Sequence, residues 1–207
     1  MIRLAALPFA LLLGTPAAAA EPLSGAQKIA RAQAYAAAVG ANDYAAARRL
    51  LSPSARVWYE KREGDGEPLS PGAGRWTHWD TFFHGRTTYA EWRVEGDAVV
   101  ATAHETNDFY RLLDWRPHPM RFTWWLDGSG AITGFMVQAT PGDTPTGSRL
   151  KDAVAWAKKA HPQEITYLMP TEKIDPTEDR AERWRKLLSE WRRQAGLPAI
   201  ELGTGGN

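Results

Sequence analysis

The stretch that most constrains the fold is residues 98–113, AVVATAHETNDFYRLL. It begins with small and apolar side chains that alternate with a period of two, as they do in a strand with one buried face. That period places the following residues on one side of the sheet: Val99, Ala101, Ala103, Glu105, Asn107 and Phe109. A carboxylate and an amide on a core-facing side cost free energy unless they are paired or meet water. We therefore expect this face of the sheet to line a cavity and not a sealed core.

Residues 1–20 have the three parts of an export signal. Arg3 gives the positive start, residues 4–13 form an apolar run, and residues 18–20 are the small side chains that precede cleavage before Glu21. The apolar run is shorter than the ~20 residues that a membrane-spanning helix needs. The alternative is an uncleaved anchor. Because no second apolar run follows, we expect a soluble, periplasmic or secreted protein with no membrane contact after cleavage.

Charge and cysteine content exclude several classes of function. The chain has 25 Lys and Arg against 24 Asp and Glu, and residues 1–20 hold one of the basic residues and no acidic one. This balance lacks the clustered cations that phosphate backbones require, so we expect no nucleic-acid partner. The absence of cysteine excludes thiol catalysis, and an exported chain without disulfides must rely on its core, for which ten tryptophans supply large side chains. We expect no metal and no cofactor, because the five histidines lack paired ligand spacing and no Gly-rich phosphate loop is present.

Helical and strand patterns alternate up to about residue 140. A capping box formed by Ser24 and Gln27 opens a helix that runs to Val39. A second helix is expected over 43–51, capped by Asn42, and an aromatic stripe predicts a third over 76–83. Strands are expected at 55–60, 87–94, from 98 onward, at 119–126 and at 131–139, with a surface loop at 61–75.

The last part of the chain predicts a linker followed by helices. Residues 141–148 have a linker composition, and a short helix is expected at 150–160. Asp175 and Pro176 mark the start of a longer helix that Gly196 ends. Its apolar stripe contains Trp184, Leu187, Leu188 and Trp191. We thus expect a signal peptide at 1–20, an α+β domain at 21–140, and a linker with a helical extension at 141–207.

The order of these elements resembles the NTF2-like superfamily, also called SnoaL-like. The segments that carry the resemblance are 34–39 (AYAAAV), 43–57 (DYAAARRLLSPSARV), 94–100 (VEGDAVV) and 127–134 (DGSGAITG). It implies an α+β fold in which a curved, mixed or antiparallel sheet wraps around N-terminal helices as a cone, with a cavity between them and frequent dimerisation. Members of the superfamily include isomerases, dehydratases, cyclases, transport adaptors and binding modules, so the resemblance implies no single function.

Glu105 and Asn107 are the first candidate site residues. Burial in a cavity would raise the pKa of Glu105 and make it a possible general acid or base. Asn107 could hydrogen-bond a ligand carbonyl or the Glu105 carboxylate. The alternatives are a strand end that reaches solvent and a structural pair with an arginine.

Asp80 is a second candidate base, because the resemblance implies a pocket-side acid at about this position; its alternative is a carboxylate on the helix surface. Tyr59 and Tyr110 could donate to an oxyanion, as in the family's ketosteroid isomerases, which pair a tyrosine with a protonated acid. That trio cannot be assembled here by matching positions.

Aromatic residues are expected to wall the cavity, and plain core packing is the alternative for each. They are Trp58, Trp76, Trp79, Trp92, Phe109 and Trp124. On the opposite, convex face of the sheet, His104 is expected at the surface. Trp125 on that face needs cover from either the C-terminal helix or a second subunit.

Three functions fit these observations. The first is an exported module that binds a small, largely apolar molecule. The second is a proton-transfer enzyme, an isomerase, dehydratase or cyclase, with Glu105 as general acid-base. The third is an envelope assembly or adaptor protein that uses the convex face, where a homodimer could also form.

Overall fold

The computed structural model describes residues 21–72, 75–116, 119–140 and 149–203, with the side chains of Arg75, Trp76 and Glu178 left out. The predicted signal peptide and the linker at 141–148 lie outside the described residues. No helix in the described part of the chain has the length and apolar character to cross a bilayer.

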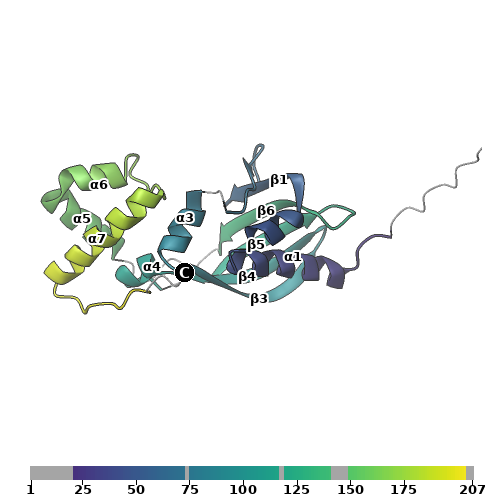
Figure 1. Ribbon diagram of the computed structural model, residues 1–207, viewed down its shortest axis with the longest axis horizontal. Coiled ribbons are helices and arrows are strands. Elements are labelled where there is room, and N and C mark those ends of the chain that lie inside the picture. Colours follow the sequence, from purple (N-terminus) through teal and green to yellow (C-terminus); the bar gives the residue numbers. More distant parts are fainter. Residues whose placement is uncertain (1–20, 73–74, 117–118, 141–148, 204–207) are drawn as a thin grey trace, which may run out of the picture.

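A curved, open six-stranded sheet forms the body of the molecule (Figure 1). Its strands are β1 (Leu51–Tyr59), β2 (Glu67–Pro68), β3 (Arg86–Glu95), β4 (Ala98–Thr106), β5 (Pro119–Leu126) and β6 (Ile132–Ala139). They lie in the order β2-β1-β6-β5-β4-β3, and only β1 and β6 pair in parallel, so the sheet is mixed. β5 spans the predicted residues, whereas β2 lies within the segment that we expected to be a loop.

Helices α1 (Gly25–Gly40) and α2 (Tyr44–Arg49) lie against the concave face of the sheet. The predicted capping box is confirmed, because the Ser24 side chain accepts from the Gln27 backbone and the Gln27 side chain accepts from the Ser24 backbone. α2 is capped by Asp43, whose carboxylate accepts from the Ala46 N–H at 2.9 Å, and not by Asn42 as expected. The core between α1, α2 and the sheet contains Ala32, Tyr35, Ala47, Val99, Ala101, Ala103, Phe122, Trp124 and Ile132.

The stretch 98–113 changes from strand to helix at Asn107. Its Oδ1 accepts a 2.8 Å hydrogen bond from the Tyr110 N–H, so it is the N-cap of α4 (Asp108–Leu112). The prediction that the strand pattern continues to Phe109 is therefore wrong. Up to Glu105 the predicted alternation of side chains between the two faces of β4 is confirmed. Ala101 and Ala103 are buried beneath the N-terminal helices, as expected for the core-facing side.

The C-terminal helices form a second core with α3 (Arg75–Phe82) and α4. They are α5 (Leu150–Ala160), α6 (Pro162–Leu168) and α7 (Glu178–Gln194), and Figure 1 shows them grouped at one end of the molecule. The predicted stripe of α7 is buried there with Trp79, Phe83 and Phe109. The division into domains stays a prediction, although this core joins segments from both sides of residue 140.

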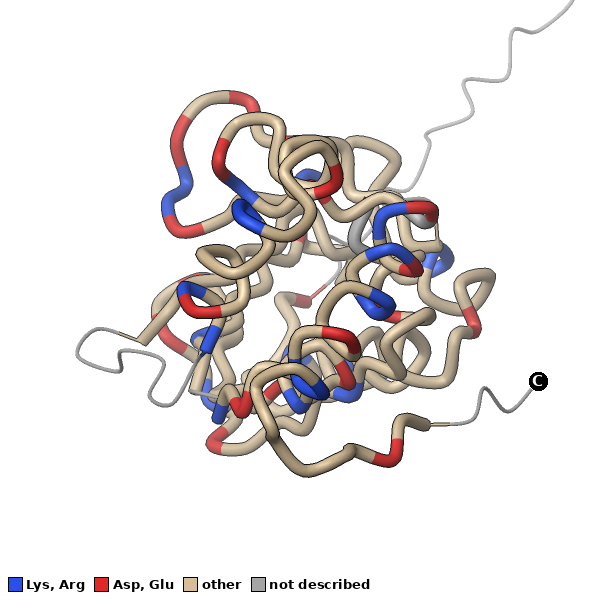
Figure 2. The backbone as a smooth tube through the Cα atoms, turned by 90° about the vertical axis from the view of Figure 1, so that its left-hand side faces the viewer, with Lys and Arg blue, Asp and Glu red and all other residues tan. Residues whose placement is uncertain are grey.

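The convex face of the sheet is covered differently from our expectation. Trp184 and Trp191 of α7 lie in the second core, so α7 does not cover Trp125. The Arg62 guanidinium lies 4.1 Å from the centre of the Trp125 ring, and Trp58 packs edge-on against that ring. Acidic and basic residues are intermixed along the backbone (Figure 2), in line with the balanced composition.

Candidate ligand-binding cavity

An open cavity of 1160 Å³ lies between α1, α3, the concave face of the sheet and the segment 67–72. A volume of this size admits a small organic molecule. The aromatic and acidic residues that line it are Tyr35, Tyr44, Tyr59, Glu67, Asp80, Tyr89, Glu105 and Phe135.

Asp80 and Glu105 reach this cavity from two different elements. Trp79 on α3 and Phe83 just after it lie in the second core, which leaves Asp80, the residue after Trp79, on the cavity side. On β4, Glu105 pairs with Thr87 of β3 and continues the concave face of the strand. The structure therefore brings together the two carboxyl groups that the sequence suggested separately.

The two carboxyl groups titrate abnormally. Burial, together with the charge of Glu105, raises the pKa of Asp80 from 3.8 to about 8. Burial also raises the pKa of Glu105, although hydrogen bonds from Asn107 and Tyr110 act in the opposite direction. Because hydrogen bonds favour the ionised form of Glu105 and the charge of Glu105 raises the pKa of Asp80, Glu105 loses its proton first and Asp80 keeps its proton at neutral pH.

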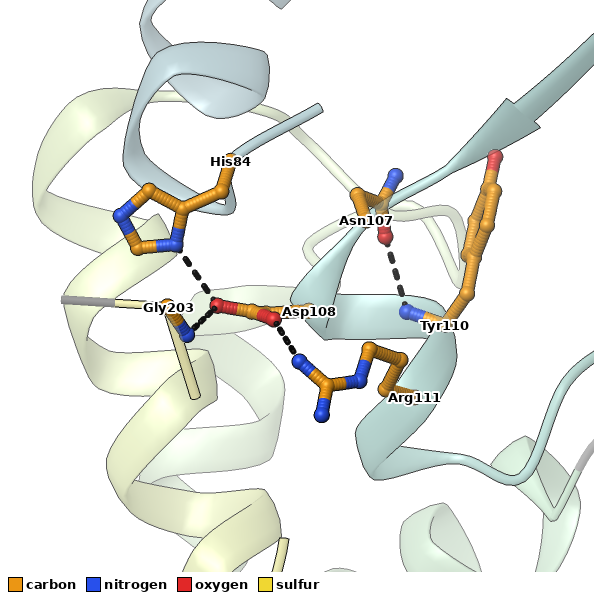
Figure 3. A network of polar contacts seen from close by, with 6 residues as sticks. All are labelled: His84, Asn107, Asp108, Tyr110, Arg111 and Gly203. Carbon is orange, nitrogen blue, oxygen red and sulfur yellow. Dashed lines mark hydrogen bonds and ion pairs between the residues drawn. The ribbon is translucent and has the colours of Figure 1, made fainter. Parts of the chain in front are cut away.

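The start of α4 holds Glu105 in place. Asn107 donates from Nδ2 to Glu105 Oε1 at 3.2 Å while its Oδ1 caps the helix. Figure 3 shows the Asn107 amide nitrogen and the Tyr110 hydroxyl on the same side of this turn. Burial first, and then the charges of Glu105 and Asp80, raise the pKa of Tyr110, so it remains a hydrogen-bond donor.

The C-terminal segment 197–203 reaches the cavity wall through Gly203, which contacts Asp108 (Figure 3). Asp108 is buried, and its Oδ2 lies 2.9 Å from the Gly203 nitrogen and 2.7 Å from His84 Nδ1. Burial raises the pKa of Asp108, but hydrogen bonds from His84, Gly203 and Arg111 outweigh it and hold the pKa below its usual value. A Cβ at position 203 would meet the His84 ring at 2.6 Å, so this close approach requires a glycine.

The same segment is fixed further back by Arg192, which is buried on α7. Its guanidinium donates to the Pro198 carbonyl, to the Leu112 carbonyl and to Asp114 Oδ1. No pattern in the sequence predicts the contact between Gly203 and Asp108, because the two residues are far apart in the chain and neither belongs to a recognisable motif.

The predicted aromatic walls lie mostly elsewhere. Trp124 is fully buried in the first core, where it stacks on Trp92 with ring centroids 5.1 Å apart. Trp79 and Phe109 lie in the second core, and Trp58 packs on the convex face. The side chain of Trp76 lies outside the described part of the structure.

Tyrosines take the place that we had assigned to tryptophans. Tyr35 projects from α1 and Tyr89 from β3, and both line the cavity. The position of Tyr89 follows from the same alternation that placed Glu105, since Tyr89 pairs with Ala103 of β4. Of the two tyrosines named from the sequence, Tyr59 lines the cavity, and Tyr110 contacts Glu105.

Comparisons with known proteins returned structures and no sequence relatives. No family model matches the chain, and no curated protein matches its sequence. Among solved structures, a protein of unknown function with a cystatin-like fold from Methylobium petroleophilum has 15% identity and a TM-score of 0.48, with 62% of this chain and 85% of that chain covered. An NTF2-like protein of unknown function from Cytophaga hutchinsonii has 15% identity and a TM-score of 0.39, with 55% and 90% covered. A protein described as a polyketide cyclase from Sinorhizobium meliloti has 18% identity and a TM-score of 0.43, with 53% and 94% covered.

The mixed sheet with the N-terminal helices on its concave face is the architecture that the resemblance implied, whereas the C-terminal helices lie outside the segments that carry the resemblance. The fold of residues 21–140 is similar to the NTF2-like fold. This fold supports many unrelated functions, so the function has to be argued from the cavity and its side chains.

Proposed function

We propose that the protein binds a small, largely apolar molecule whose polar group contacts Asp80 and Glu105. The observation that carries this proposal is that two carboxyl groups with raised pKa values line one cavity. Tyr35, Tyr89 and Phe135 supply the aromatic part of the wall. A few polar groups on an otherwise apolar wall are typical of sites for small ligands.

A thermal-shift screen tests binding directly. We expect apolar molecules with one polar group to raise the melting temperature of the native protein, because a ligand that binds only the folded state stabilises it. Replacing Tyr89 by Ala, which widens the cavity next to Glu105, should weaken the hits. The matched control is His104→Ala, an exposed residue of β4 on the convex face. A broad library that produced no shift would contradict the proposal.

A second candidate function is proton transfer by an isomerase, dehydratase or cyclase. It is favoured by the different environments of the two carboxyl groups, which leave an acid and a base side by side at neutral pH. Glu105 would accept a proton from the substrate, and Asp80 would donate a hydrogen bond to the oxygen on which charge develops. Asn107 and Tyr110 would orient Glu105.

A kinetic comparison separates catalysis from binding alone. Once a turned-over substrate is found, Glu105→Gln should lower kcat by about 10²–10⁴-fold, the usual contribution of a general base. His104→Gln, on the opposite face of the same strand, should leave kcat unchanged. If Glu105→Gln retained the native rate, Glu105 would not be the base.

We also propose that the protein acts outside the cytoplasm, in the periplasm or the medium. The residue pattern of positions 1–20 supports this proposal. N-terminal sequencing of the protein from its native cell should begin at Glu21, and a chain that retained Met1 would contradict it. The homodimer through the convex face stays a prediction from the resemblance.

A further inference from the structure

The charged groups that line the cavity near the carboxyl pair are unbalanced. The basic lining residues are His84 and Arg86. His84 contacts Asp108, and Arg86 is an exposed residue at the start of β3. Among the described residues, neither Asp80 nor Glu105 has a basic side chain as an ion-pair partner.

Two tyrosine hydroxyls at the same cavity also lack partners. No residue in the described ranges forms a hydrogen bond with the hydroxyl of Tyr35 or Tyr89, although both side chains are deeply placed and line the cavity. These hydroxyls and the two carboxyl groups are not among the described polar atoms that are shut off from solvent without a partner, so they face the open cavity. A molecule bound in the cavity can therefore form hydrogen bonds and ion pairs with them.

Resting on the proposed function, we propose that the bound molecule carries a protonated amine, seated between Asp80, Glu105 and the tyrosines Tyr35 and Tyr89. An ammonium group has three N–H donors and no acceptor, which matches a wall of carboxylate and hydroxyl oxygens. Its charge pairs with the carboxylates, and the tyrosine rings provide faces that attract cations. An alcohol could satisfy the hydrogen bonds but not the charge, and a carboxylate would be repelled.

Amine binding has a consequence for the proton on Asp80. In the empty cavity the pKa of Asp80 is about 8, so most molecules carry this proton at pH 7. An ammonium group beside Asp80 favours its ionised form, and the carboxyl proton passes to the buffer. Up to about one proton is therefore released for each amine bound.

A matched series of ligands tests the proposal with the full chain. Tryptamine, tryptophol and indole-3-acetate share an indole body and differ in their positive, neutral or negative head, and naphthalene counterparts provide a second body. Calorimetry at pH 7, in buffers of different ionisation enthalpy, measures both the affinity and the protons released. We expect each amine to bind at least about tenfold tighter than its alcohol, which corresponds to one additional charge pair, and each carboxylate to bind weakest.

The variants and the outcomes separate the two proposals. Asp80→Asn should abolish the proton release, and Glu105→Gln should remove most of the preference for amine over alcohol. Equal affinity for amine and alcohol in the native protein would overturn the amine class and leave the binding function intact. If no compound of the indole or naphthalene series bound, while other neutral molecules raised the melting temperature, the proposal of an amine ligand would fail and the binding function would stand. If nothing bound in either assay, both proposals would fail.

Discussion

Asp80→Asn is expected to make the protein more stable than the native chain at pH 9 and to leave its stability at pH 3 nearly unchanged. The folded-state pKa of Asp80 is about 8, whereas the ordinary value is 3.8. At low pH the carboxyl group is protonated in both the folded and the unfolded state, so its ionisation does not lower the free energy of unfolding. As pH rises past 3.8 the unfolded state loses this proton and the folded state keeps it, so stability falls until the pH passes about 8.

The size of this effect follows from the shift. At ~1.4 kcal/mol for each pKa unit, a rise from 3.8 to about 8 corresponds to ~5–6 kcal/mol in full. Because the cavity is open to water and its walls can relax, we expect Asp80→Asn to stabilise the protein by about 2–4 kcal/mol at pH 9. Urea unfolding between pH 3 and pH 9 measures it, with Asp65→Asn in the exposed loop as control. Parallel stability curves for Asp80→Asn and the native chain would show that Asp80 is not buried as described.

Trp184→Ala is expected to destabilise the whole protein. Trp184 is fully buried, and its ring packs at 90° against Phe109 with centroids 5.6 Å apart. Replacing a buried tryptophan by alanine costs ~3–5 kcal/mol from lost burial and the cavity left behind. Since the indole N–H of Trp184 has no hydrogen-bond partner within the described residues, no bond is lost, and we expect the lower end, about 3 kcal/mol.

The same substitution tests whether the C-terminal helices belong to the folding unit of the sheet. Their core includes Trp79, the residue before Asp80 on α3, and Phe83, just after the end of α3. We therefore expect a single unfolding transition, shifted to lower urea when followed by circular dichroism and by tryptophan fluorescence. Trp156→Ala, at a partly exposed position on α5, should cost less than half as much. Two separate transitions, with the sheet unaffected, would mean that the C-terminal helices contact the sheet domain but unfold independently of it.

Local patterns in the sequence were sufficient for most of the fold. Alternation predicted β3, β5 and β6, and the capping box at Ser24 predicted the start of α1. α6 was missed, although Pro162 at its first turn is a recognised start signal. α4 was missed because Asn107 falls on the core-facing side of the alternating pattern and also caps a helix, and only the hydrogen bond from the Tyr110 N–H distinguishes the two.

The candidate site was predictable where one strand carried it. Glu105 was found because a carboxylate on an apolar face costs free energy, and the alternation within a single strand is enough to show that Glu105 lies on such a face. The tyrosine walls and the contact between Gly203 and Asp108 depend on which elements meet in space. Tryptophans are the larger apolar side chains, and they were assigned to the cavity, but they gain most from full burial and occupy the two cores.

The central claim is that Asp80 and Glu105 share a cavity and titrate as a coupled pair. Carbon-13 NMR of the side-chain carboxyl carbons, followed from pH 3 to pH 10 and assigned with Asp80→Asn and Glu105→Gln, measures this directly. We predict that the Asp80 signal has its midpoint near pH 8, that Glu105 titrates above its ordinary range, and that Glu105→Gln moves the Asp80 midpoint down. Midpoints near pH 4 for both carboxyl groups, with neither affected by removal of the other, would contradict the account.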